Sequence, residues 1–126
     1  MTNESKAAPC FRTPLSTIED WEPNARPGPD GQLHVVGERR TMATYGEPAD
    51  PTTIGLFRCG PAVGSEFTFP TGDATGYVIQ GKASVRLLDE GTTLELQAGD
   101  LFQFKKGTRT QWTYHDMFIK FETVIP

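Results

Sequence analysis

From Arg40 onward, apolar and polar residues alternate in short runs that glycine and proline residues separate. Aromatic and β-branched residues are concentrated in these runs, and turn residues recur about every ten positions, which is typical of antiparallel sheets. Because no helical period lies between the runs, the sequence predicts an all-β sandwich or barrel. The predicted strands are Thr53–Cys59, Ser65–Phe69, Thr75–Gln80, Lys82–Leu88, Thr92–Gln97, Leu101–Phe104, Arg109–Tyr114 and Met117–Ile125.

Turn residues between these strands carry more specific predictions. The segment "DEGTT" predicts a hairpin turn after Leu88. Gly81 and Gly99 each follow an apolar strand end and precede a new strand. We expect a positive φ or a close approach of two strands at both glycines, because other residues tolerate neither well.

The residues before the strand-rich region have a different pattern. We expect residues 1–39 to form a partly irregular N-terminal arm and residues 40–126 to form the barrel. Met1–Thr13 is polar and small, and is expected to be frayed. A weak capping-box pattern favours one helical turn over Ser16–Trp21. The isolated Trp21 is expected to anchor the arm on the barrel.

Composition narrows the class of protein. The chain has 126 residues, 13 glycines and 10 prolines, which fits one turn-rich domain. A net charge of −4 without a basic block argues against nucleic acid as a partner. The two cysteines fit a reducing compartment, and no signal peptide or membrane helix is evident. We therefore expect a cytoplasmic protein without nucleic-acid or membrane partners.

The segment "GYVIQGKASVRLLDEGTTLELQAGDLFQFKKGTRTQW" resembles the cupin superfamily. In detail it is similar to the small single-domain cupins of the ureidoglycine aminohydrolase type, also called the third cupin or DUF861-like family. The residues that carry this resemblance are Gly99-Asp100, Lys105-Lys106-Gly107, Trp112 and Lys120. The resemblance implies a cupin (RmlC-like) jelly-roll, or double-stranded β-helix, barrel and a homodimer.

The resemblance also implies where metal ligands would lie. Counting back from Gly81 places Ala74 at the family's glutamate position. The paired histidine positions become Phe67 and Phe69, or else Thr68 and Pro70, and the last histidine position becomes Thr110. None of these residues provides an imidazole or a carboxylate, so we expect no metal and no other cofactor.

Other candidate donors favour structural roles. His34 lies in the arm, and His115 adjoins Asp116 in a predicted turn, where a solvated loop is expected. Cys59 is expected to be a small buried apolar residue, with a nucleophile as the alternative. The cluster of Lys105, Lys106 and Arg109 is expected to be a solvated turn, and the alternative is a rim that attracts anions.

Several side chains are candidates for the barrel interior. The family-like positions predict that Phe67, Phe69, Ala74, Thr110 and Trp112 point inward. Such residues either fill a core or line a pocket, and the sequence leaves both open.

Two further residues complete the set of pocket candidates, Tyr77 and Lys120. Lys120 interrupts the apolar run "MFIKFETVI". It either faces solvent or is partly buried beside a carboxylate such as Glu122 or Asp73.

Three functions remain open from the sequence. The first is a metal-free barrel that binds a small organic metabolite. The second is a hydrolase or isomerase of a small nitrogenous or carboxylate metabolite, for which Tyr77, Glu66 and Lys120 are the acid–base candidates. The third is a non-catalytic dimeric interaction protein whose arm pairs with the neighbouring barrel.

Overall fold

The computed structural model describes residues 14–126 except residues 29 and 70. The fraying expected for Met1–Thr13 therefore lies outside the described residues. Within the described part, no helix has the length and hydropathy of a membrane span. After a 3-10 helix at Leu15–Thr17, the strands are β1 (Glu22–Pro27), β2 (Leu33–Tyr45), β3 (Thr52–Cys59), β4 (Ala62–Thr68), β5 (Asp73–Gln80), β6 (Lys82–Leu87), β7 (Thr92–Gln97), β8 (Leu101–Phe104), β9 (Arg109–Tyr114) and β10 (Phe118–Ile125).

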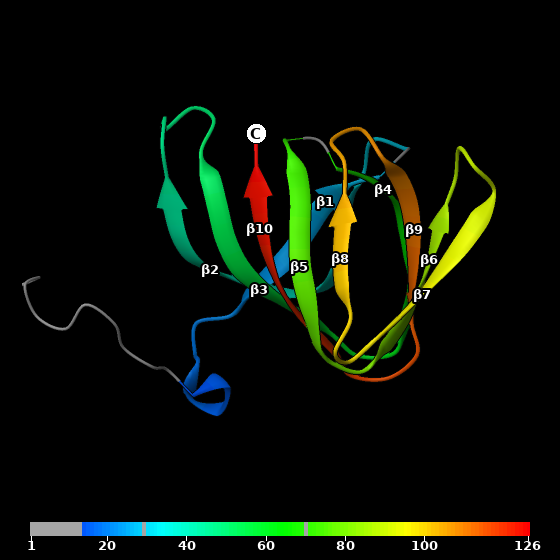
Figure 1. Ribbon diagram of the computed structural model, residues 1–126, viewed down its shortest axis with the longest axis horizontal. Helices are drawn as coiled ribbons and strands as arrows, with labels where there is room; N and C mark the ends of the chain where they lie inside the picture. The colour runs from blue at the N-terminus through cyan, green and yellow to red at the C-terminus, as the bar shows by residue number, and fades with distance from the viewer. Residues whose placement is uncertain (1–13, 29, 70) are drawn as a thin grey trace, which may run out of the picture.

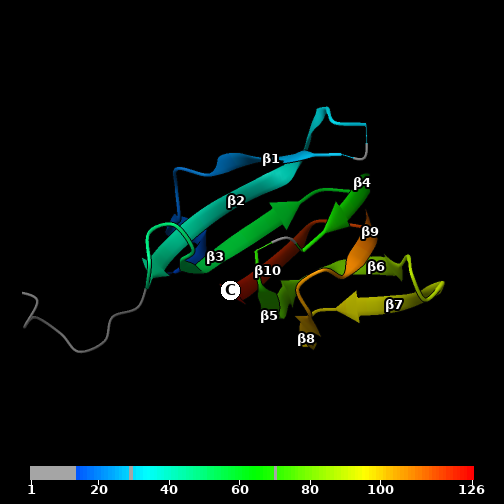
Figure 2. The same cartoon turned by 90° about the horizontal axis from the view of Figure 1, so that it is seen from above.

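Two antiparallel sheets enclose the core. The larger has the strand order β1-β2-β3-β10-β5-β8, and the smaller has the order β4-β9-β6-β7. Figure 1 shows β2 and β3 at the left, β6 and β7 at the right, and β10, β5 and β8 between them. Figure 2 shows the same arrangement from above, with β1 and β2 continuing the larger sheet. The architecture is a jelly roll, which confirms the all-β prediction.

The alternation of buried and exposed side chains along the strands shows where the core lies. On β5, Ala74 and Val78 are fully buried whereas Thr75 is exposed, and on β9 Thr110 and Trp112 are buried. Side chains two positions apart share a face of a strand, so the aromatic residues gather between the sheets. The core cluster consists of Phe57, Cys59, Phe69, Ala74, Val78, Ala83, Val85, Leu96, Phe102, Phe104, Trp112, Tyr114 and Phe118.

Both glycine turns have the expected backbone. Gly81 has a φ of 86° and Gly99 a φ of 98°. A Cβ atom on Gly81 would collide with the backbone carbonyl of Met117, so this turn requires glycine for steric reasons too. At the Gly99 turn, an Asp100 carboxylate oxygen accepts a hydrogen bond of 2.9 Å from the backbone N–H of Gln97. The glycines therefore fix where β5 ends and β8 begins.

The N-terminal region differs from the expected irregular arm. β1 and β2 form an antiparallel hairpin, and β2 pairs with β3 of the same chain from Glu38 to Tyr45. The expected boundary between residues 39 and 40 therefore falls inside a continuous strand. The helical turn is limited to Leu15–Thr17 and has no side-chain cap, so the expected capping box does not form.

Trp21 packs against the outer face of the larger sheet. The guanidinium of Arg58, on β3, lies 4.0 Å from the centroid of the indole ring. The indole N–H donates a hydrogen bond of 3.2 Å to the carbonyl oxygen of Ile18. Trp21 thus connects the segment before β1 to the barrel, as an anchor does.

Candidate functional site

A cavity of about 150 Å³ lies inside the barrel, bordered by residues of β1, β2, β3, β4, β9 and β10. The barrel interior is therefore not packed solid. The aromatic side chains of the wall are Phe57, Phe67, Phe69, Trp112 and Tyr114. The charged lining residues are Arg26, Arg39, Arg40, Glu66, Lys120 and Glu122.

Lys120 brings a positive charge into this aromatic wall. It is only 6 % exposed, and its ammonium lies 4.5 Å from the ring centroid of Trp112. The rings of Phe57 and Phe102 lie at 5.3 and 5.5 Å. Such faces attract a cation through the negative potential of the π system. The three surrounding rings therefore restrict the position of the Lys120 ammonium.

The carboxylate partner of Lys120 is Glu122, at 3.3 Å. Both residues lie on β10 two positions apart, so both side chains point into the cavity. Of the two arrangements left open by the sequence, the structure has the buried pair. The other proposed partner, Asp73, instead lies 3.9 Å from the exposed Lys105 ammonium.

The aromatic walls pack against one another. Phe67 meets Phe69 edge to face at a centroid distance of 4.9 Å, and Phe69 stacks on Phe104 at 5.1 Å. Trp112 stacks on Tyr114 at 5.9 Å. These contacts fix the rings, because aromatic pairs favour such geometries. Phe67, Phe69 and Trp112, all predicted to point inward, are brought together here.

Ala74 and Thr110 point inward too, but they are not lining residues of the cavity. Both are fully buried. The Thr110 hydroxyl donates to the carbonyl oxygen of Phe67 at 2.8 Å and accepts from the Trp112 indole N–H at 3.1 Å. The hydroxyl is therefore engaged in holding β4 and the Trp112 ring. Thr110 is a positioning residue for the wall of the cavity.

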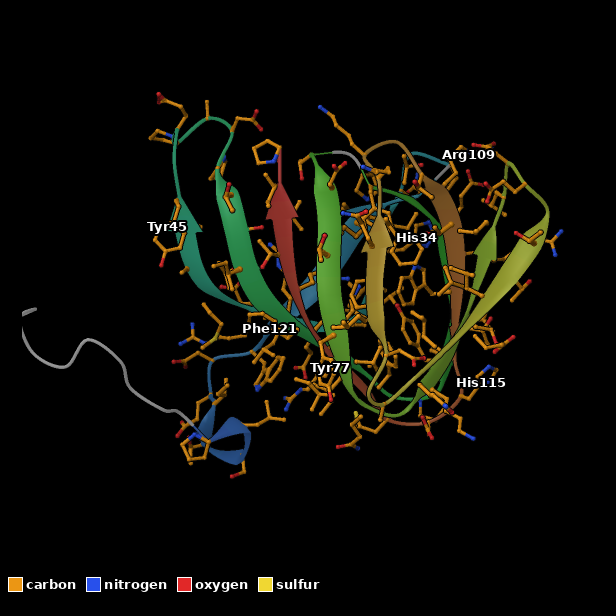
Figure 3. The ribbon with its side chains drawn as sticks, in the orientation of Figure 1. His34, Tyr45, Tyr77, Arg109, His115 and Phe121 are labelled. Atoms are coloured by element: carbon orange, nitrogen blue, oxygen red, sulfur yellow. The ribbon has the colours of Figure 1, made fainter. Side chains whose placement is uncertain are left out.

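Tyr77 lies on the outer face of the larger sheet. It is 43 % exposed and pairs in register with Phe121 of β10, which Figure 3 shows beside it. Its neighbours Gly76 and Val78 face inward, so alternation turns Tyr77 outward. Tyr77 is thus removed from the pocket candidates.

Glu66 lines the cavity but is held by a cation outside it. Arg109 donates two hydrogen bonds to the same Glu66 oxygen, at 3.1 and 2.9 Å, and another to Asp89 at 2.6 Å. The hydrogen bonds from Glu66, then Asp89, raise the pKa of Arg109 above its usual value. Arg109 therefore holds Glu66 in place and bridges the two carboxylates.

Two functional candidates lie in the region expected to be irregular. Arg26 is on β1, and Arg39 is on β2 opposite the inward-facing Phe57. The Arg26 guanidinium lies 5.1 Å from the ring centroid of Phe67. Burial and, secondly, the charge of Arg39 lower the pKa of Arg26, whereas Glu122 raises it. Their place in the cavity follows from the hairpin, which no local signal in the sequence revealed.

The residues at the implied metal positions do not fit a transition metal. Phe67, Phe69 and Ala74 have no donor atom, and the hydroxyl of Thr110 is already engaged. The alternative position Thr68 is exposed, and residue 70 lies outside the described part. Nor does the described part contain a group of three or more His, Cys, Asp or Glu side chains placed to hold a metal ion.

The remaining donors lie apart from one another. His34, near the start of β2, pairs with Asp30 of the preceding turn at 3.0 Å. His115 contacts the Ser84 hydroxyl at 2.7 Å, and Figure 3 shows it below His34 and apart from it. Cys59 is buried in the core, and burial raises the pKa of its thiol. A raised pKa disfavours the thiolate, so Cys59 has the character of a buried apolar residue.

The fold and the interior site define a small cupin barrel. Residues 46–121 match the EutQ-like cupin domain, and the chain belongs to this family of cupins. A search of curated proteins finds no match to the sequence.

Solved structures share the fold. A protein assigned to ethanolamine utilization from Salmonella typhimurium is 17% identical, with a TM-score of 0.61 over 86% of this chain and 98% of that chain. KdgF from a Halomonas species is 22% identical, with a TM-score of 0.60 over 86% and 87% of the two chains. A DUF861 family protein from Thermotoga maritima is 21% identical, with a TM-score of 0.51 over 56% and 76%.

Proposed function

We propose that the chain binds a small organic molecule in the barrel cavity, without a metal at the usual cupin positions. The observation that carries this proposal is the Lys120 ammonium, which is buried among aromatic rings at the wall of an open cavity. A barrel that served only as a scaffold could fill this space with apolar side chains. Retaining a cavity with a few placed polar groups is typical of a ligand site.

The residues that line the cavity also support this proposal through their positions and their chemical character. Aromatic faces supply contact area, and the Lys120–Glu122 pair supplies a donor and an acceptor at the wall. The cavity is smaller than the roughly 300–1,000 Å³ of sites for drug-sized ligands, so the ligand is a small metabolite. A cytoplasmic location stays a prediction.

Tryptophan fluorescence provides the test, because the two tryptophans lie in different places. Trp21→Phe leaves Trp112 as the single reporter in the cavity wall. We expect small organic molecules from a screened panel to change its emission saturably. Lys120→Met should weaken binding of the hits, whereas Lys82→Met, at an exposed position, should not. Unchanged affinity in Lys120→Met would remove Lys120 from the site.

The metal-free part of the proposal has its own test. Elemental analysis of the untagged protein, purified without chelators, should find no stoichiometric zinc, iron, manganese or nickel. About one ion per chain would contradict the proposal and direct attention to the histidines and carboxylates.

A hydrolase or isomerase is the alternative, and one observation favours it. Of the acid–base candidates, Tyr77 lies outside and Glu66 is bound by Arg109, but Lys120 lies at the cavity wall. Proton NMR of each hit incubated with the protein tests this alternative. Turnover that disappears in Lys120→Met would support an enzyme, and unchanged spectra would support binding alone.

We also propose that the chain forms a homodimer through the outer face of its larger sheet. Leu101, Tyr77 and Phe121 are register neighbours there, with exposures of 80, 43 and 39 %. On the same face Arg58 is neutralised by Glu38 at 2.8 Å, so two copies would meet without charge repulsion. Light scattering should give the dimer mass for the wild type and the monomer mass for Phe121→Glu.

A further inference from the structure

The arginines that line the cavity lack carboxylate partners within the described part of the chain. Among the described residues, neither Arg26 nor Arg39 has a carboxylate oxygen within the 4.0 Å of an ion pair. The Nε atom of Arg26 is buried and has no hydrogen-bond partner in this part of the chain. A buried donor without a partner lowers stability, and most buried donors in proteins have one. The cavity therefore keeps a donor free that a ligand can satisfy.

The two cavity carboxylates are already occupied. Glu66 accepts hydrogen bonds from Arg109, and Glu122 pairs with Lys120. A cationic ligand would therefore meet only carboxylates that a neighbouring cation already neutralises. An anionic ligand would find Arg26 and Arg39, whose mutual repulsion is one cause of the lowered pKa of Arg26.

The charge of the cavity also differs in sign from that of the protein. The chain has a net charge of −4, yet the inward-facing Arg26, Arg39 and Lys120 outnumber the two carboxylates. A concave site with apolar walls focuses such a potential and concentrates ions of opposite charge. Binding an anion would relieve the repulsion between the two arginines.

We propose that the ligand is a small organic anion with an apolar body, in which a carboxylate or phosphate contacts Arg26 and Arg39. This inference rests on the proposed binding function and names the class of ligand. Guanidinium groups bind both anions through paired N–H donors. The apolar body would lie along Phe67, Phe69 and Trp112, next to the cation that Arg26 presents over the Phe67 ring.

Matched probes test this proposal by ligand-detected NMR and by Trp112 fluorescence. Benzoate and phenyl phosphate each attach an anionic group to a phenyl ring, and benzamide attaches a neutral amide to the same ring. We expect the better anion to bind at least about tenfold more tightly than benzamide, the usual order for one charge-assisted contact. The order of the two anions identifies carboxylate or phosphate as the preferred group.

Arginine variants locate the contact. Arg26→Gln and Arg39→Gln should each weaken anion binding about tenfold and leave benzamide unaffected. Arg86→Gln is the control, because Arg86 is an exposed residue of β6 that does not line the cavity. Arg39 is exposed as well, so Arg39→Gln stays folded and decides the question if Arg26→Gln does not.

The outcomes separate this inference from the proposed function. Equal affinity for benzamide and the anions, or unchanged anion affinity in Arg39→Gln, would overturn the anion proposal and leave the binding function intact. Failure of the whole screened panel, neutral and charged, to bind the wild type would overturn the binding function itself. Anion preference that both arginine variants abolish would establish the proposal.

Discussion

Replacing Lys120 by methionine should leave the barrel as stable or make it more stable. The ammonium is buried among three rings, and its side chain is 8 % exposed beside a Glu122 side chain that is 22 % exposed. Methionine is similar in length, has no charge and packs well against aromatic rings. The change therefore removes the charge from the cavity wall without leaving a large void.

The opposing energies can be compared from this geometry. Cation–π attraction is worth about 2 kcal/mol when the cation is desolvated. Taking an ion out of water costs several kcal/mol, which methionine avoids. Methionine also gains roughly 0.3–1.5 kcal/mol for each favourable sulfur–aromatic contact. In the variant, the Glu122 carboxylate would still be partly exposed to water and close to the charge of Arg26. We therefore expect the free energy of unfolding to rise by about 0–2 kcal/mol.

Removing the other partner should have the opposite sign. Glu122→Gln leaves the Lys120 ammonium buried without its carboxylate. Breaking a fully buried pair costs about 3–5 kcal/mol, and the partial exposure of Glu122 reduces this to about 1–3 kcal/mol. The two substitutions therefore distinguish the cost of a buried charge from the benefit of the pair.

Urea unfolding followed by circular dichroism measures both changes, with Lys82→Met as the exposed control that should stay within about 0.5 kcal/mol. A loss of more than about 1 kcal/mol in Lys120→Met, together with a neutral Glu122→Gln, would refute the reasoning. It would mean that the ammonium holds the barrel together. In that case Lys120 would be explained by its contribution to the stability of the fold, and its charge would be no evidence for a ligand.

Other predictions concern the framework around the cavity. Thr110→Val should lower the free energy of unfolding by about 1–3 kcal/mol, because the Phe67 carbonyl oxygen and the Trp112 indole N–H both lose their hydroxyl partner. Thr110→Ser keeps the hydroxyl and should retain most of the wild-type stability in urea titrations. Gly81→Ala should abolish folding or lower the melting temperature sharply. Gly91→Ala should lower the melting temperature less, because its Cβ would meet nothing within 4 Å and only the φ of 74° is unfavourable. Burial raises the pKa values of Tyr114 and Cys59 above their usual 10.0 and 9.0, so their contribution to stability is complete below these values and is lost as pH rises toward the folded pKa. Urea midpoints should therefore fall between about pH 9 and 11, and Tyr114→Phe should flatten this dependence.

Much of the barrel was predictable because its strands follow local rules. β7, β8 and β9 have the predicted limits, and the other predicted strands differ by a few residues at their ends. Each has alternating or continuous apolar residues bounded by turn residues. β1 and β2 were missed because β1 contains prolines and neither strand has a fully buried residue, so no run of apolar residues marks them in the sequence.

The site was harder to predict because it depends on pairing between distant strands. Arg26 and Arg39 reach the cavity through the β1–β2 hairpin and its register with β3, which the local sequence does not specify. Tyr77 could have been placed correctly: it is an odd number of positions from the inward-facing Ala74, so it must face outward. Phe67 and Trp112 follow the same parity rule and do line the cavity.

The hairpin that carries Arg26 also covers an edge of the sheet. β1 is the terminal strand of its sheet, and Pro23 and Pro27 cannot donate hydrogen bonds along it. β2 behind it is a strand of 13 residues, Leu33–Tyr45, with continuous N–H and C=O groups. A chain shortened to begin after residue 32 would present that long edge to solvent. We expect such a chain to self-associate through strand pairing, because β1 covers this edge in the intact chain while it also carries Arg26 to the cavity.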